Sequence, residues 1–261
     1  MKELLYILLV ALAISVFGQS VSAQPGGLPN DDRGDHSKMD PWYPEQWGRY
    51  TAQVSAGTAP REKRVITKGP LAPPESDRST YAAFLRINST GLLRLRPREN
   101  FGNDSSGVPG GSAYYGAYYS FSGITHYSGY GSDLELFNHA LSVGFVGADF
   151  GMLTFEDRPL EQIAWGDPDL RYISEYKPPT AERDARLESR LFRSGVTNNG
   201  QLYRGRLPVV VNLTYLLRAV RYGRSDVLVA FRIVSKDTDG SVIILWKLLK
   251  QYPTPKLGPT H

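Results

Sequence analysis

The last third of the chain holds three long apolar segments, and their spacing constrains the fold more than any other feature. The segments cover residues 208–221, 226–236 and 241–251, and each is rich in Val, Ile, Leu and aromatic residues. Two short polar turns, 222–225 and 237–240, join them. Apolar segments separated by such turns are typical of neighbouring antiparallel strands. The sequence therefore predicts a C-terminal three-stranded meander.

Both faces of the second and third predicted strands are largely apolar. Side chains alternate between the two faces of a strand, so every second residue shares a face. The second strand places Val227, Val229, Phe231 and Ile233 opposite Leu228, Ala230, Arg232 and Val234. The third strand places Val242, Ile244, Trp246 and Leu248 opposite Ile243, Leu245, Lys247 and Leu249. A sheet with two apolar faces has to be covered on both sides.

The region before the meander predicts further short strands and one helix. The apolar segments 81–87 and 92–96 flank turn-forming residues and predict a β-hairpin. Four further segments predict antiparallel strands, at 113–121, 133–137, 141–146 and 150–155. A helix is expected at about 180–194, with Thr180 as its N-cap and Gly195 at its end.

These elements predict a mainly β fold in a single domain at residues 80–261. The two architectures that satisfy the pattern are an antiparallel β-sandwich and a curled barrel-like sheet, with the one helix packed against it. Residues 24–79 are rich in Pro, Gly, Asp and Ser, and they predict a partly disordered arm. Within this arm, Trp42 and Trp47 suggest a segment that docks on the domain or on a partner.

The first 23 residues predict a cleavable export signal. Lys2 precedes an apolar core at 4–17, and the small residues Val21, Ser22 and Ala23 follow it. A core of about 14 residues is too short for a helix that spans a bilayer core of ~30 Å. We expect export to the periplasm or the outside of the cell, and no membrane-spanning segment after the signal.

Composition excludes several classes of site. The chain has no Cys, so it has no disulfide framework and no Cys-based zinc site. Freedom from Cys in an exported protein favours a bacterial envelope. The net charge of +4 arises from 30 basic and 26 acidic residues without a dense basic stripe, which argues against nucleic-acid binding. With four histidines and no HExxH motif, no metal and no cofactor are expected.

A region rich in Tyr and Gly is the leading candidate for a binding surface. Six of the 16 tyrosines lie close together, at Tyr114, Tyr115, Tyr118, Tyr119, Tyr127 and Tyr130. Tyrosine combines a flat apolar ring with a hydroxyl, and neighbouring glycines leave room for a ligand. The alternative is structural, because aromatic residues are common in strands and glycines in bulges. A protein or polysaccharide partner would fit the binding interpretation.

Two carboxylates on one predicted strand are the candidates for catalysis. Asp133 and Glu135 are two residues apart and therefore share a face. A pair of carboxylates can hydrolyse a glycosidic bond, one acting as acid and the other as nucleophile or base. His126 and His139 could add proton transfer. The alternation with Leu134 and Leu136 is, however, also typical of a half-exposed structural strand.

Three functions stay open on the sequence. The first is a non-catalytic exported binding domain that acts in the cell envelope or outside the cell. The second is a secreted carbohydrate-active hydrolase that uses Asp133 and Glu135. The third is a structural component of envelope assembly. No catalytic motif such as GxSxG or a phosphate-binding glycine loop is present to favour an enzyme.

Overall fold

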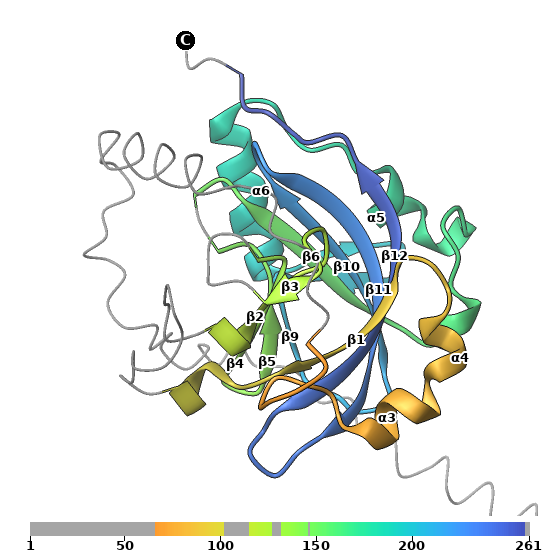
Figure 1. The fold of residues 1–261 in the computed structure, drawn as a ribbon. Helices are drawn as coiled ribbons and strands as arrows, with labels where there is room; N and C mark the ends of the chain where they lie inside the picture. Colours follow the sequence, from red (N-terminus) through yellow and green to blue (C-terminus); the bar gives the residue numbers. More distant parts are fainter. Residues whose placement is uncertain (1–65, 102–114, 127–131, 146, 259–261) are drawn as a thin grey trace, which may run out of the picture. The chain divides into compact units, whose positions relative to one another are not determined.

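Two antiparallel five-stranded sheets form the described part of the protein (Figure 1). The structure is a computed structural model, and it describes residues 66–101, 115–126, 132–145 and 147–258. All of these residues belong to one compact unit, Ser55–His261. None of its described helices is long and apolar enough to cross a membrane.

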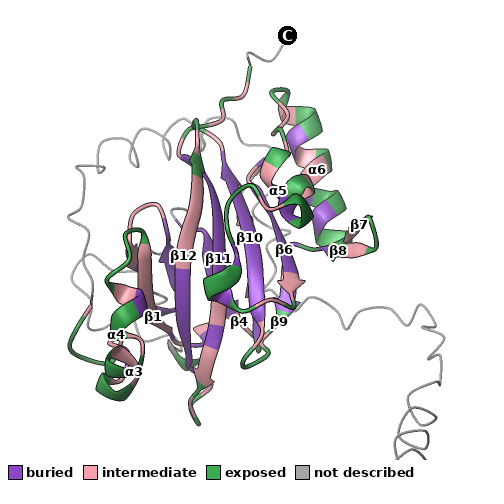
Figure 2. Cartoon of the chain, turned by 90° about the vertical axis from the view of Figure 1, so that its right-hand side faces the viewer, coloured by how far each residue is buried: buried purple, intermediate pink, exposed green. Residues whose placement is uncertain are grey.

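The first sheet contains the predicted meander. Its strand order is β1 (Thr90–Leu95), β12 (Val242–Tyr252), β11 (Ser225–Lys236), β10 (Thr214–Arg221) and β6 (Phe150–Glu156). The meander is therefore confirmed at the centre of the sheet, but its first strand begins at Thr214 and not at residue 208, because residues 206–208 pair in the second sheet. Figure 2 shows that β10 is buried throughout and β11 over most of its length.

The second sheet is built from shorter strands. Its order is β3 (Thr125–His126), β2 (Tyr118–Ser120), β4 (Leu134–Phe137), β5 (Ala140–Ser142) and β9 (Arg206–Pro208). A separate hairpin is formed by β7 (Val196–Asn198) and β8 (Gln201–Tyr203). The described strands form open sheets, so the antiparallel sandwich is the architecture found and the barrel-like alternative is not.

Two apolar cores cover the two faces of the first sheet, as its two-sided pattern requires. The core between the sheets contains Val227, Val229, Phe231 and Ile233 from β11. The core on the other face contains Leu228 and Ala230 and is closed by helices. These helices are α4 (Ala82–Leu85), α5 (Arg171–Glu175) and α6 (Glu182–Ser194), with 3₁₀ turns at Leu160–Gln162 and Pro168–Leu170, whereas α3 (Glu75–Thr80) has no buried residue. The predicted division of faces along β11 is therefore confirmed.

The predicted hairpin of 81–87 with 92–96 is wrong. Residues 82–85 are helical, and β1 pairs instead with β12, where Leu93 lies opposite Ile244. Phe84 is the one buried residue of α4, and the partly buried Tyr81 and Leu85 pack against the same helix-side core. The edge of the long meander offers β1 more hydrogen bonds and apolar contacts than a seven-residue neighbour could. Tertiary pairing therefore overrides the local hairpin signal.

Two further predicted strands are shorter than expected. Among the described residues of 113–121, Tyr115–Ala117 form a 3₁₀ turn and only β2 is extended. Within 141–146, the strand β5 ends at Ser142. Gly144 has a φ of +78°, which a strand does not allow. The strands predicted at 133–137 and 150–155 correspond to β4 and β6.

The predicted helix is present as α6, but its N-cap is different. It ends at Gly195, which has a φ of +108° as expected for a glycine stop. At its start the capping residue is Ala181, and no side chain caps the helix. Thr180 instead accepts a hydrogen bond at its carbonyl from the N–H of Gly258, at 2.7 Å. The C-terminal segment is thus held beside the start of α6.

Residues 66–79, at the end of the predicted arm, lie against the domain where the structure describes them. Pro73 is buried, and α3 follows it directly. Ile66 and Leu71 contact the same cavity as β1. The domain boundary expected at residue 80 stays a prediction, as does the state of residues 24–65.

Candidate functional site

Asp133 is an internal anchor between the two sheets. Asp133 is 1% exposed, and its carboxylate lies 3.0 Å from Nε of Arg221, the last residue of β10. The same carboxylate accepts a hydrogen bond from the N–H of Phe121 at 2.7 Å. Both carboxylate oxygens therefore make contacts within the fold: Oδ1 with Arg221 of the first sheet, and Oδ2 with Phe121, which follows β2 of the second sheet.

Glu135 also has a cationic partner. Its Oε1 lies 3.2 Å from Nη1 of Arg98, and Glu135 is 7% exposed. The Arg98 guanidinium is also stacked 5.2 Å from the centre of the Phe137 ring. The Glu135 carboxylate thus fixes the 3₁₀ turn Arg98–Phe101 to β4.

His126 is held neutral in the interior. It is 3% exposed, and its Nε2 lies 2.7 Å from the carbonyl oxygen of Arg94. Burial lowers its pKa to about 4, against the opposing effect of that carbonyl. A carbonyl can only accept, so Nε2 carries the proton of the neutral ring. His139 differs, since it is exposed in the β4–β5 turn with a φ of +56°.

The predicted tyrosine surface is only partly described. Tyr118 and Tyr119 are buried, at 6% and 5% exposure, so neither offers a free ring face. Tyr119 packs edge-on against Phe121 and His126 in the core between the sheets. Only the backbone of Tyr115 is described. Tyr114, Tyr127, Tyr130, Trp42 and Trp47 lie outside the described residues, so the binding surface predicted from them stays a prediction.

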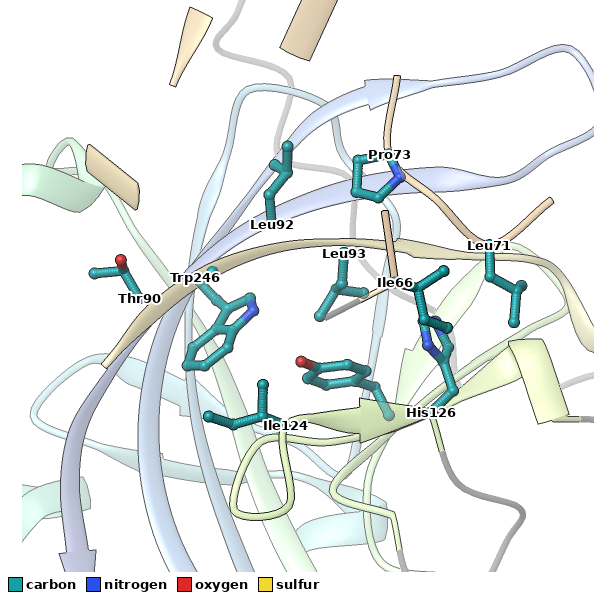
Figure 3. A pocket seen from close by; sticks show the side chains of 11 residues that line it. Ile66, Leu71, Pro73, Thr90, Leu92, Leu93, Ile124, His126 and Trp246 are labelled. Carbon is teal, nitrogen blue, oxygen red and sulfur yellow. The ribbon is translucent and has the colours of Figure 1, made fainter. Parts of the chain in front are cut away.

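A small cavity lies beside Tyr119, between β1, β3 and β12 (Figure 3). Its volume is about 40 Å³, and its wall is mainly apolar. Figure 3 shows the indole nitrogen of Trp246 pointing into it, and this N–H has no hydrogen-bond partner among the described residues. An apolar cavity that admits benzene has about 150 Å³, so this one suits water rather than an organic ligand.

Trp165 is the exposed aromatic residue that the sequence interpretation missed. It is 54% exposed and lies in the tight turn 164–167. The N–H of Asp167 donates to the carbonyl of Ala164, and Gly166 has a φ of +93°, which a type II turn requires at its third residue. The available signal was an aromatic residue inside the turn-forming sequence Ala-Trp-Gly-Asp-Pro.

Trp165 is the outer end of a stack of alternating cations and rings. Nζ of Lys250 lies 4.2 Å from the Trp165 ring centre and 4.7 Å from that of Tyr252. On the inner side, the guanidinium of Arg218 lies 3.4 Å from the centre of the Tyr252 ring. Each cation–ring contact is favourable electrostatically, and it is stronger where water is excluded. The stack links the surface to the buried ion pair of Arg218 with Asp226.

A β-bulge makes this stack possible. Leu228 pairs with Lys250 but the next residue, Val229, pairs with Leu248, so Leu249 is an extra residue in β12. Trp246 therefore belongs to the core between the sheets, whereas Tyr252 belongs to the helix side. Strict alternation would have placed Lys250 and Tyr252 on the same face as Trp246. Bulges commonly re-aim side chains in this way.

The described residues contain no grouping of three His, Asp or Glu side chains that could hold a metal ion. The expectation that no cofactor is needed stays a prediction.

Comparison with known proteins gives no family. The sequence matches no protein-family model, and neither curated proteins nor solved structures gave a match. Function therefore has to be argued from the geometry alone.

Proposed function

We propose that the chain is an exported, non-catalytic binding domain that acts in the cell envelope or outside the cell. One observation carries the proposal: three of the four candidate acid–base groups, Asp133, Glu135 and His126, are engaged in contacts within the fold. A general acid or base has to reach its substrate directly or through one water. These three groups reach neighbouring strands and turns instead.

The exposed aromatic ring of Trp165 supports the same function. A large aromatic residue that is exposed on the surface of a domain is often an anchor for binding. Contact with a ligand buries its apolar area, which is favourable. This ring is also held on a short turn, which lowers the ordering cost of binding. The export signal predicted at residues 1–23 supports the location.

The location is tested by fractionating cells that express the full chain, including residues 1–23. We expect a protein that begins at Gln24, by mass spectrometry, in the exported fraction. A chain that keeps residues 1–23 and stays in the cytoplasm would contradict the proposal.

The binding role is tested by photo-crosslinking in intact cells, with a photoreactive residue at Trp165 and, as a matched control, at Leu187 on α6. Leu187 is 46% exposed and lies on a different surface element. We expect adducts from position 165 only. Equal adduct formation at both positions, or none at 165, would count against binding through this surface.

A further inference from the structure

We propose that Trp165, Lys250 and the turn 164–167 form a carbohydrate-binding site, in which the Trp165 ring stacks on a sugar ring of a polysaccharide. This inference rests on the proposed binding function and names the ligand class. No candidate site of the sequence included either residue. Three observations support it: the turn fixes the position of the Trp165 ring, the β-bulge directs Lys250 toward that ring, and most exposed neighbours of Trp165 are polar.

The turn that carries Trp165 is fixed by charged side chains. Oδ2 of Asp167 accepts the N–H of Ala164 at 3.0 Å and a hydrogen bond from Nη1 of Arg158 at 2.8 Å. Arg158 is itself fixed, because its Nε donates to Glu156 on β6 at 2.8 Å. The Ala164 N–H and the Arg158 guanidinium lower the pKa of Asp167, so this anchor is charged at neutral pH. The network therefore holds in place a ring that is 54% exposed.

Lys250 reaches the ring only because of the bulge at Leu249. Its ammonium lies over both rings and makes no ion pair with a described carboxylate. Its three N–H donors are therefore not fully used by the protein. On the same strand, Lys247 donates to the carbonyl of Glu161 at 3.3 Å. A bulge that costs a ladder hydrogen bond and delivers a cation to an exposed indole is a feature expected at a functional site.

The chemistry around Trp165 favours a sugar over an apolar protein surface. The exposed neighbours at residues 161–169 are Glu161, Gln162, Ala164, Gly166, Pro168 and Asp169, and among these six Pro168 alone has an apolar side chain larger than a methyl group. A pyranose ring has an apolar face of C–H groups that fits a flat indole, and its rim of hydroxyls requires donors and acceptors. Lysine ammonium, amide and carboxylate groups supply both. A protein hot spot would instead be ringed by further apolar contacts.

The site is tested with the protein purified from the fraction in which it accumulates. Electrophoresis in gels that contain a soluble polysaccharide measures binding as retarded migration. Dextran is the neutral probe and alginate the carboxylated probe, while co-sedimentation with peptidoglycan sacculi tests an insoluble glycan. The two soluble probes decide whether the Lys250 ammonium binds hydroxyls or carboxylates.

We expect at least one probe to bind, and Trp165→Ala to weaken that binding by at least about tenfold. Trp165→Phe, which keeps a smaller flat ring, should lose less. Leu187→Ala, on another exposed surface, should bind as the wild type does. Unfolding in urea checks that each variant is folded, and the change of tryptophan fluorescence with added polysaccharide, present in the wild type and absent in Trp165→Phe, gives a second readout.

Three results would overturn the site. They are no binding to any of the three probes, binding unchanged in Trp165→Ala, and an equal loss in Leu187→Ala. If crosslinking at position 165 then still captured a defined partner protein in cells, the binding function would stand and the carbohydrate ligand would be wrong. If crosslinking also failed, both would be wrong.

Discussion

The guanidinium of Arg218 and the carboxylate of Asp226 form a bidentate ion pair in the helix-side core. Nε lies 2.5 Å from Oδ1 and Nη2 lies 2.9 Å from Oδ2, and the two side chains are 1% and 2% exposed. Arg218 also donates to the carbonyl of Ile173 at 2.8 Å. The pair thus joins β10 and β11 to the C-terminal end of α5, and it supports the Tyr252 ring of the surface stack.

Removal of the Asp226 charge should destabilise the protein strongly. Asp226→Ala leaves a buried guanidinium without its counter-ion, and such changes cost about 3–5 kcal/mol. Denaturation in urea measures the change in the free energy of unfolding. The matched control is Glu175→Ala, whose pair with Arg171 is more than 70% exposed on both sides and is expected to cost less than about 1 kcal/mol. Equal losses in the two variants would show that the buried pair does not stabilise the fold.

Asp133→Asn should lower stability far more than Glu135→Gln. Asp133 is the counter-ion of Arg221, which is 8% exposed in its side chain, whereas the partner of Glu135 is Arg98 at 25%. We expect a loss of about 3 kcal/mol for the first and about 1 kcal/mol for the second. Urea unfolding gives both values. If Asp133→Asn instead kept full stability and abolished hydrolysis of a glycan, the hydrolase hypothesis would be supported.

Gly91→Ala should disturb the contact between β1 and Trp246. A Cβ at position 91 would lie 2.6 Å from two carbon atoms of the indole, Cε2 and Cζ2, and the buried Trp246 ring cannot easily move. Overpacking of this kind costs about 1–3 kcal/mol. Gly205→Ala is the matched control, since its Cβ would meet its nearest atoms at 3.7 Å. Thermal unfolding compares the two, and a larger loss at position 205 would refute the close contact.

His126 and Asp149 should make stability depend on pH in opposite directions. Burial lowers the pKa of His126 from 6.5 to about 4, so the unfolded chain takes up its proton first as the pH falls. This contribution is complete above pH 6.5 and is lost toward pH 4, by about 3 kcal/mol. Burial raises the pKa of Asp149 from 3.8 to about 6, so its folded form takes up the proton first and gains stability over the same range.

Single variants separate the two groups. Asp149→Asn should lose stability more steeply than the wild type between pH 6.5 and pH 4, because only the His126 effect remains. His126→Gln should show the reverse trend. Urea midpoints at several pH values test this, and parallel curves for all three proteins would contradict both assignments. The carbonyl of Arg94 remains available to the glutamine amide in the second variant.

The meander shows which features of the fold the periodicity of the sequence can predict. The alternation of Val227, Val229, Phe231 and Ile233 with Leu228 and Ala230 correctly predicted two covered faces, because a residue's side of a strand follows from its position alone. The helix at α6 was predictable for a similar reason, since Gly195 is a local stop signal. Its N-cap was not, because the Thr180 carbonyl is used by Gly258, a residue distant in sequence.

The interior roles of the charged residues could not be read from sequence. Asp133 and Glu135 alternate with leucines as on a half-exposed strand, yet both are buried. Their burial depends on Arg221 and Arg98, which come from segments 88 and 37 residues away. Trp165 was missed because its turn reads as an ordinary connection, and its partner Lys250 is brought to it by a bulge.

The sequence by itself determined the central strands, the two-sided burial of the sheet and the end of α6, because these follow from local periodicity and from turn-forming residues. Only the tertiary structure decided that residues 82–85 are helical, that β1 pairs with β12, and that the Leu249 bulge turns Lys250 and Tyr252 toward the helices. Each of these outcomes depends on contacts between distant segments, whose packing and hydrogen-bond energies outweigh local preference. The stack that ends at Trp165 belongs to this second group.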